Sequence, residues 1–446
     1  MFPSTVDSQH PPSLAEIARR LVSPRTGVIH RLRLLGLEAG EQRAAHVHAR
    51  LPNLGVLPGG GKIFDAGGSA LDLQGAVAAS LFEAVERYAA AFVDHRRLVL
   101  AKPRPGGPFL MGDELPLFTD AQYDQPRFPF RRLTPDSEIY WVEARSLRTG
   151  ARAFVPAICV FIPYEPTSPA EWLGPCTSTG MASGTNRARA VAGGLFEVCE
   201  RDAFMILWYH RLSLPRLRVD PASTLGLWVA RLAERRGANV TFVNMTNDLR
   251  VPAVLAVLES RLHGKRLLTM GASAKPTLSE AAEKALLEAI SDARRLRDMM
   301  AAQREPWRPA PGFTNVVDFA WHSLVYTDPE LQPVLDFITA SREEQEMGME
   351  YGLSRLDGPA LVEELVARVA ARGEEPFVVE LTTRDLADLG IHVVKVMVPG
   401  AVPMNPDHRF PWIAQRRLYA APRVLGLRDR DAVAGELNLA YPHPFA

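Results

Sequence analysis

The chain has 446 residues, of which 47% are hydrophobic, so it contains enough apolar material for a substantial buried core. Lysine plus arginine and aspartate plus glutamate number 51 each, and this balance excludes an overall charge that would attract nucleic acid or an anionic membrane. The three cysteines include no Cys-x-x-Cys motif, and they favour neither a disulfide framework nor a structural zinc site.

The N-terminal segment has neither a basic leader nor an apolar run, and no stretch approaches the roughly 20 apolar residues that a membrane span needs. We therefore expect a cytoplasmic protein, as the unpaired cysteines also suggest. Residues 1–24 are predicted to be an N-terminal tail and lead-in, with a helix in SLAEIARRLV that Ser13 caps. Residues 25–446 are predicted to form the main domain.

Several segments have strand character because they are rich in β-branched and aromatic residues. They cover residues 138–147, 153–162, 239–246, 252–260, 376–383 and 392–400. Helical segments lie irregularly between them, which predicts a mixed α/β (α+β) fold rather than a regular barrel. Proline-rich stretches predict loops or insertions near residues 101–108 and 303–313, and residues 441–446 are predicted to form a Pro-containing C-terminal tail.

One helical segment occurs twice. Residues 75–88 read GAVAASLFEAVERY and residues 189–202 read RAVAGGLFEVCERD, so both contain Leu-Phe-Glu-x-x-Glu-Arg. On a helix, Glu83, Glu86 and Arg87 lie within about 100° of one another, opposite an apolar stripe. The second copy places Glu197, Glu200 and Arg201 on the corresponding face.

Small residues precede both carboxylate pairs on the same helix face. They are Ala76, Ala79 and Ser80 in the first copy and Ala190, Gly193 and Gly194 in the second. A glycine inside a helix costs roughly 1 kcal/mol relative to alanine, so a close approach must offset that loss. We expect a ligand or a second helix against this face.

A single Glu-x-x-Glu-Arg face is commonly a solvated surface with i, i+4 ion pairs. Solvated faces have no reason to repeat in register, whereas four carboxylates from two helices can hold divalent cations such as Mg²⁺, and arginines can neutralise phosphate. A fainter third copy spans residues 281–294, with Glu288 in place of the first glutamate and Ser291 in place of the second. The pattern indicates a cradle for a nucleotide and a metal without a phosphate loop.

Residues 78–92 and 178–204, together with 389–422, resemble the YcaO family, and the likeness covers most of the chain from near residue 25. The resemblance implies a YcaO-like fold in which internally duplicated helix-plus-sheet units surround a nucleotide cradle. Within the family, VPGAVPMNPDHR and the ending YPHPFA are similar to cyclodehydratases that form thiazoline and oxazoline rings in ribosomal peptides. There a Cys, Ser or Thr side chain attacks the preceding amide carbonyl, ATP phosphorylates the resulting oxygen, and phosphate leaves in place of water.

The resemblance also assigns roles to individual residues, with ATP and Mg²⁺ as cofactors. It implies that magnesium is bound by Glu83, Glu86, Glu197 and Glu200, and that the nucleotide is contacted by Arg87, Arg201, Ser69, Thr185 and Glu288. The terminal carboxylate of Ala446, at the end of a stiff tail, is implied to act as a base. The implied partners are a precursor peptide, a leader-binding protein, a flavin-dependent azoline dehydrogenase and a second copy of the chain.

Some positions depart from the family pattern and keep other hypotheses open. Ser69 lies where relatives have Gly-Lys-Gly, Thr185 lies in a segment where they have Gly-Asn-Thr, and Arg189 replaces an acidic residue. These replacements favour a nucleotide-silent YcaO-like scaffold subunit as the second hypothesis. A YcaO-type enzyme that forms thioamides or amidines is the third, and a merely disordered tail is the alternative to an ordered one.

Overall fold

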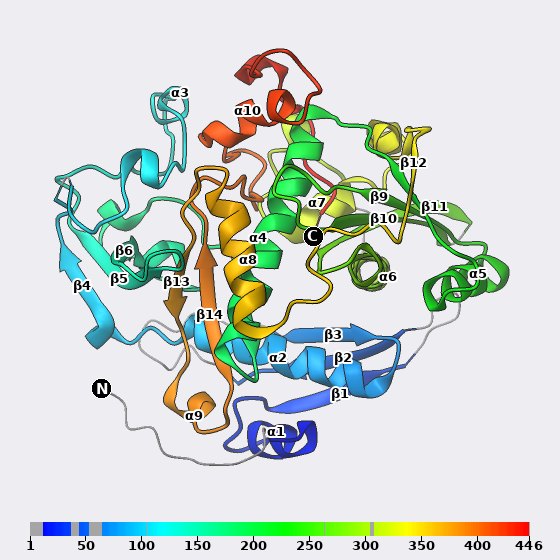
Figure 1. The fold of residues 1–446 in the computed structure, drawn as a ribbon, viewed down its shortest axis with the longest axis horizontal. Coiled ribbons are helices and arrows are strands. Elements are labelled where there is room, and N and C mark those ends of the chain that lie inside the picture. Colours follow the sequence, from blue (N-terminus) through cyan, green and yellow to red (C-terminus); the bar gives the residue numbers. More distant parts are fainter. Residues whose placement is uncertain are drawn as a thin grey trace.

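The structure is a computed structural model that describes residues 12–36, 44–52, 65–104, 106–262, 264–303 and 307–445. Its strands form sheets of three, five and six strands, and helices lie against each of them (Figure 1). The mixed α/β class that the sequence predicts is confirmed. Ala446, the predicted catalytic base, lies outside the described residues.

The first unit is a three-stranded antiparallel sheet with α2 (Leu73–Ala91) against it. Its strand order is β1 (Arg31–Leu35), β2 (Ala45–Arg50) and β3 (Ala66–Ala70). Asp72 caps α2, and the apolar stripe of the first repeat, Leu81 and Val85, is buried. Helix α1 (Leu14–Leu21), which Ser13 caps as predicted, buries Ile17 in the same hydrophobic core. The boundary proposed at residue 25 stays a prediction.

The second unit is the six-stranded sheet, on which α4 (Arg187–His210) packs. Its strands run in the order β4 (Leu98–Ala101), β5 (Ile139–Ser146), β13 (Phe377–Glu380), β14 (His392–Met397) and β7 (Met181–Gly184), and β6 (Arg152–Pro156) pairs with β5. The short helices α3 (Asp120–Tyr123) and α9 (Arg384–Ala387) lie in its connections. Helix α4 contacts β7 and β14, and Asn186 caps it. The second repeat thus lies on a sheet in the same way as the first.

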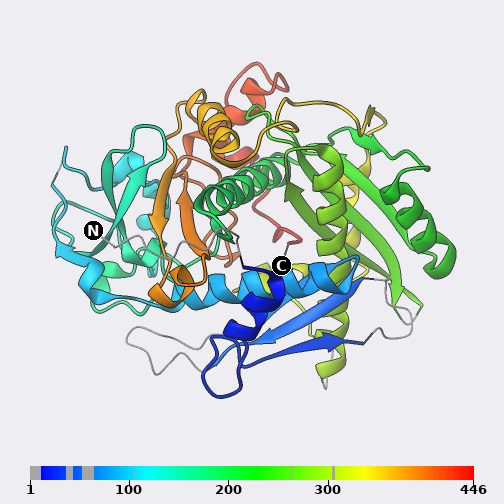
Figure 2. The same cartoon turned by 60° about the horizontal axis from the view of Figure 1, so that its bottom comes forward.

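The third unit is the five-stranded sheet, on which α6 (Leu278–Ala302) packs (Figure 2). Its strand order is β11 (Lys265–Ala274), β10 (Ala253–Leu262), β9 (Asn239–Asn244), β8 (Arg216–Arg218) and β12 (Glu344–Glu346). The other helices are α5 (Thr224–Arg236), α7 (Phe319–Val325), α8 (Gly358–Ala370) and α10 (Arg416–Val424). Helix α6 carries the faint third copy, so all three copies lie on helices that cover a sheet.

A glycine allows each of these helices to approach its strand closely. A Cβ atom at Gly68 would lie 2.1 Å from the Ser80 amide nitrogen, one at Gly271 would lie 2.1 Å from the Ala285 carbonyl oxygen, and one at Gly194 would lie 2.6 Å from a carbonyl oxygen. Real Cβ atoms do not approach backbone this closely, so only glycine fits these crossings.

The glycine contacts correct one prediction. For Ser80 and Gly194 the close neighbour on the small-residue face is the strand or loop that packs on the helix, and not the ligand or second helix that we expected. Ala79 and Gly193, by contrast, face an open cavity. The small residues therefore serve both helix–strand packing and the cavity wall.

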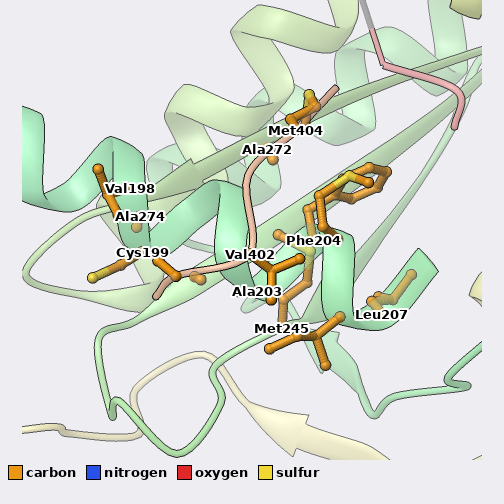
Figure 3. Packing of buried hydrophobic residues seen from close by; sticks show 14 of the residues in the cluster. Val198, Cys199, Ala203, Phe204, Leu207, Met245, Ala272, Ala274, Val402 and Met404 are labelled. Atoms are coloured by element: carbon orange, nitrogen blue, oxygen red, sulfur yellow. The ribbon is translucent and has the colours of Figure 1, made fainter. Parts of the chain in front are cut away.

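The other face of α4 is buried in the largest hydrophobic core. Figure 3 shows Cys199 and Phe204 of α4 among Ala272 of β11, Val402 and Met404. At the middle of this face the carboxylate of Asp202 is fully buried, and the Arg417 guanidinium of α10 donates to it at 2.8 Å. A second buried carboxylate, Asp248, accepts from Arg417 at 2.7 Å. This network ties α4 to the C-terminal part of the chain.

The C-terminal tail is ordered through Phe445, so the disordered alternative is wrong for residues 441–445. The Tyr326 hydroxyl donates to the carbonyl of Pro442, and the His443 carbonyl lies 3.0 Å from Nδ1 of His322. The Phe445 ring packs 4.5 Å from Phe204 of α4. Both ribbon views place this end of the chain in the middle of the molecule (Figures 1 and 2).

Candidate functional site

A cavity of about 710 Å³ lies among α2, α4 and α6, with β3 and the end of the C-terminal tail in its wall. Both copies of the repeat and the third, fainter copy line it. The predicted site residues that it brings together are Ser69, Glu83, Glu86, Arg87, Glu197, Glu200, Arg201 and Glu288. Residues more than 200 positions apart in the chain therefore share one site, as the duplication suggested.

Thr185 is not among the described residues that line this cavity. It lines a separate depression with Leu14, Asp72 and Gln74. The segment in which it lies begins α4, and Asn186 is its N-cap, accepting from the Arg189 amide at 2.9 Å. The role of these residues in the described structure is thus to start the helix. Phe445, the residue before Ala446, does line the main cavity.

Each of the three helices presents one glutamate paired with a cation one turn away. Glu83 and Arg87 of α2 are 3.3 Å apart, and Glu197 and Arg201 of α4 are 3.1 Å apart. On α6 the order is reversed, because Lys284 precedes Glu288, at 3.4 Å. The three units therefore repeat the same charge pair in one cavity.

Backbone N–H groups position the glutamates of the repeat. Gly67 in β3 donates to Glu83 at 3.4 Å, and Gly180 before β7 donates to Glu197 at 3.2 Å. Ser183 donates to Glu86 twice, from its amide at 2.9 Å and from its hydroxyl at 2.7 Å. A strand, or the residue just before one, thus holds Glu83, Glu86 and Glu197 in place, which is why the repeat needs a sheet as well as a helix.

Three of the cavity carboxylates, those of Glu86, Glu197 and Glu200, have a raised pKa. Burial raises the pKa of Glu86 to about 8, against the Ser183 hydrogen bonds, and the nearby charges of Glu83 and Glu197 add to the increase. Burial, then the neighbouring Glu288, raises the pKa of Glu200 well above its usual value. Burial also raises the pKa of Glu197, although Arg201 opposes it. Crowded, buried carboxylates of this kind are stabilised by a bound cation.

Cationic and hydroxyl side chains complete the wall of the cavity. Lys275 and Lys284 line the cavity, and burial lowers the pKa of Lys275. Ser291, the residue in place of the second glutamate on α6, donates to the Ser69 hydroxyl at 2.7 Å, and Ser69 lies 2.8 Å from His46 Nδ1. Ser69 and Ser291 were named in the sequence analysis, whereas Lys275 and Lys284 were not; the position of Lys284, one turn before Glu288, is the signal that could have revealed it.

The residues fit a magnesium-bound nucleotide better than a metal held by protein alone. Among the described residues, no group of three or more His, Cys, Asp or Glu side chains converges on one point at metal-binding distance. Mg²⁺ in nucleotide sites is commonly held by one or two carboxylates, waters and substrate phosphates. Separate carboxylates across a wide cavity, interleaved with arginines and lysines, match that arrangement.

Comparison with known proteins agrees with this geometry. The family model described as YcaO cyclodehydratase, ATP- and Mg²⁺-binding, matches residues 67–402, which is more than half of the chain. The chain belongs to the YcaO family. This YcaO protein is also 31% identical over 278 residues to an uncharacterized protein of Methanothermobacter thermautotrophicus, covering 61% of its own length and 67% of that protein.

Two solved structures show that the fold is shared. A heterocyclase in complex with substrate and cofactor has a TM-score of 0.80 at 20% identity; the match covers all of this YcaO chain but only 59% of the longer heterocyclase chain. YcaO from Methanopyrus kandleri, bound with AMPPCP and Mg²⁺, has a TM-score of 0.60 at 24% identity, covering 86% of this chain and 88% of that one. Within the described residues of this YcaO protein, no helix has the length and apolar character to cross a membrane.

Proposed function

We propose that the protein is an ATP- and Mg²⁺-dependent cyclodehydratase that forms thiazoline or oxazoline rings in a ribosomal precursor peptide. The observation that carries the proposal is the convergence of both repeated segments, together with α6, on one cavity. Membership of the YcaO cyclodehydratase family supports it. So do the descriptions of the two structures with the same fold, one with substrate and cofactor and one with AMPPCP and Mg²⁺.

The roles of the cavity residues follow from their charges. When bound, Mg²⁺–ATP supplies the phosphoryl group that turns an amide oxygen into a leaving group. The repeat glutamates hold magnesium, with one or two carboxylates to an ion, and the cations that line the same cavity bind phosphate oxygens. These residues are Glu83, Glu86, Glu197, Glu200, Arg87, Arg201, Lys275 and Lys284. Ser69 and Glu288 contact the nucleotide at the α6 side of the cavity.

The peptide reaction balances with the loss of one water. A Cys thiol or a Ser or Thr hydroxyl of the peptide forms a bond to the preceding amide carbon, and the bond from that carbon to its oxygen breaks. The proton of the thiol or hydroxyl and that of the amide nitrogen are both given up. The Ala446 carboxylate is proposed as the base, supported by the position of the preceding Phe445 in the cavity wall.

A peptide substrate requires recognition beyond the reacting residue. We propose a separate leader-binding protein as the partner, supported by the fold that this chain shares with a chain of the E. coli microcin synthetase McbBCD complex, at a TM-score of 0.61 over 93% of this chain. A flavin-dependent azoline dehydrogenase would act on the azoline product. A homodimer stays a prediction.

The test measures nucleotide binding and turnover. Calorimetric titration of the protein with Mg²⁺–ATP is compared among the parent, Glu83→Gln and Glu197→Gln. Each substitution is expected to weaken binding at least about tenfold, because a contact to a bound ion contributes more than about 1.4 kcal/mol. Glu364→Gln is the matched control: Glu364 pairs with Arg368 at 2.7 Å and i, i+4 spacing, but on α8, outside the cavity.

ATP turnover with candidate peptides and partners then identifies the reaction. A peptide product lighter by one water supports the cyclodehydratase, whereas a product carrying sulfur in place of oxygen supports a thioamide-forming enzyme. A parent protein without affinity for Mg²⁺–ATP at millimolar concentration would support the nucleotide-silent scaffold and overturn the proposal.

A further inference from the structure

A second, smaller cavity shares a wall with the nucleotide cavity. Its volume is about 120 Å³, and it lies between β14, the start of α10 and the loops around residues 115–117 and 174–179. Along the shared wall, Ser178 faces the large cavity while Thr177 and Thr179 face the small one. In the same way, Glu197 faces the large cavity and its neighbour Val198 the small one. A molecule in the small cavity is therefore separated from Glu197, one of the glutamates proposed to hold the metal, by a wall one residue thick.

The walls of the small cavity are mainly apolar, but they carry three buried polar atoms without a hydrogen-bond partner among the described residues. These atoms are Oγ1 of Thr179, Nε1 of Trp412 and Oε1 of Gln415. Trp412 and Gln415 are only 6% and 2% exposed. A buried polar group without a partner costs about 1–3 kcal/mol, so three in one cavity indicate a ligand that satisfies them.

The geometry fixes which of these atoms donate and which accept. Nε2 of Gln415 donates to the Pro116 carbonyl at 2.7 Å, and this bond leaves Oε1 as the acceptor. The Trp412 indole N–H is only a donor, and the Thr179 hydroxyl can donate. Lys395, 3% exposed, also lines the cavity and donates to the Thr177 carbonyl, which leaves it further N–H groups. The cavity thus offers donors for a carbonyl oxygen and one acceptor for an N–H.

We propose that this cavity binds an aliphatic residue of the substrate polypeptide next to the residue that is modified. A peptide group matches the polar atoms, since its carbonyl accepts from Trp412 and Thr179 and its N–H donates to Gln415. The apolar walls enclose the side chain. A cavity of about 150 Å³ holds benzene, so one of about 120 Å³ holds a valine, leucine or isoleucine side chain and excludes an indole. The identity of the ligand as substrate rests on the proposed function.

The test uses a blocked amino acid as the probe and needs no ATP. The full chain is labelled with 5-fluorotryptophan, the Trp412 fluorine resonance is assigned with Trp412→Phe, and N-acetyl-leucinamide is titrated. A ligand of this size is expected to bind with a dissociation constant in the millimolar range. N-acetyl-glycinamide, which lacks the side chain, and N-acetyl-tryptophanamide, which is too large, are expected to leave the resonance unchanged.

Two variants separate a ligand site from a structural feature. Thr179→Val removes one hydrogen bond to the probe and is expected to raise its dissociation constant about fivefold, while thermal stability is unchanged or higher because the hydroxyl has no partner. Ser168→Ala, which removes another partnerless buried hydroxyl outside both cavities, is expected to leave binding unchanged. Gly174→Ala places a methyl group 3.8 Å from Trp412 Nε1, without a clash, and is expected to abolish binding.

The proposal is overturned if no blocked amino acid shifts the Trp412 resonance, or if Thr179→Val binds the probe as well as the parent does. It is also overturned if N-acetyl-tryptophanamide binds at this site as tightly as the leucine probe. Because the titration is made without nucleotide, its failure is distinguishable from a failure to bind Mg²⁺–ATP. If the protein binds the leucine probe but not ATP, the result supports a peptide-binding site on a nucleotide-silent scaffold.

Discussion

Replacement of Glu86 by glutamine removes a charge from the cavity but keeps a side-chain oxygen that can accept from Ser183. Burial raises the pKa of Glu86 from 4.5 to about 8 in the folded protein. An unfolded glutamate loses its proton near 4.5, so between these values the folded state binds a proton that the unfolded state does not. The stability of the ligand-free protein therefore falls as the pH rises through this range, and the loss is complete above about pH 8.

The size of the effect follows from the pKa difference. A pKa shift from 4.5 to about 8 limits the loss of unfolding free energy to about 5 kcal/mol, at 1.36 kcal/mol for each pKa unit. Glu86 is partly exposed to the cavity, and solvent screening reduces this to about 2–3 kcal/mol. In a chain of 446 residues, 1 kcal/mol corresponds to about 1 °C in the melting temperature. We expect Glu86→Gln to melt about 2–3 °C above the parent at about pH 9 and less than about 1 °C above it at about pH 5.

Scanning calorimetry of the ligand-free proteins across this pH range measures the difference. Glu364→Gln, which removes the partner of the half-buried Arg368 on α8, is expected to change the melting temperature by a similar amount at both pH values. Added Mg²⁺ is expected to stabilise the parent at about pH 9 more than Glu86→Gln, since a cation stabilises the buried, ionised carboxylate that the variant lacks. A Glu86→Gln protein that is less stable than the parent at about pH 9, or a gain that does not grow with pH, would refute the reasoning.

Two further predictions concern the framework that carries the site. Gly68→Ala is expected to disrupt the contact between β3 and α2, because the new methyl group would lie 2.1 Å from the Ser80 amide nitrogen. In denaturant unfolding it is expected to lower the free energy of unfolding by more than about 3 kcal/mol. Gly435→Ala, with open space around the new methyl group, is expected to lower it by less than about 1 kcal/mol. Arg417→Met is expected to cost about 3–5 kcal/mol, because it leaves the buried Asp202 carboxylate without its cation; an unchanged denaturation midpoint would contradict this.

The sequence predicted the elements whose pattern is local. The repeat fixed the faces of α2 and α4, and most of the expected strands match β5, β9, β10, β13 and β14. The segment 153–162 is a strand only to Pro156 and then turns, and β11 was missed although it is ten residues long. Short strands such as β8 and the edge strand β12 have too few residues to show a period.

The parts of the site that the sequence did not reveal depend on contacts across the fold. Ser183 holds Glu86 from a strand almost a hundred residues away, and although it lies in the segment that resembles the family, neither the repeat nor the resemblance gave it a role. Lys275 and Phe445 enter the cavity because their elements meet α4 there. Thr185 was placed at the nucleotide by alignment to a motif, but its local role beside the N-cap of α4 takes it to another depression. The position of a residue in a motif predicts its chemical role only where the backbone places its side chain in the same site.

The third unit explains why the duplication is imperfect. A fully repeated α6 would bring another carboxylate to the place of Ser291, in the cavity where burial, and then the charge of Glu288, already raise the pKa of Glu200. The Ser291 hydroxyl instead bonds to Ser69 and adds no charge. Two glutamates on each of α2 and α4, and one on α6, make a cavity that is acidic between the first two helices and mixed in charge beside the third. Under the proposed function, this distribution of charge favours magnesium between α2 and α4 and phosphate oxygens beside the cations that border it.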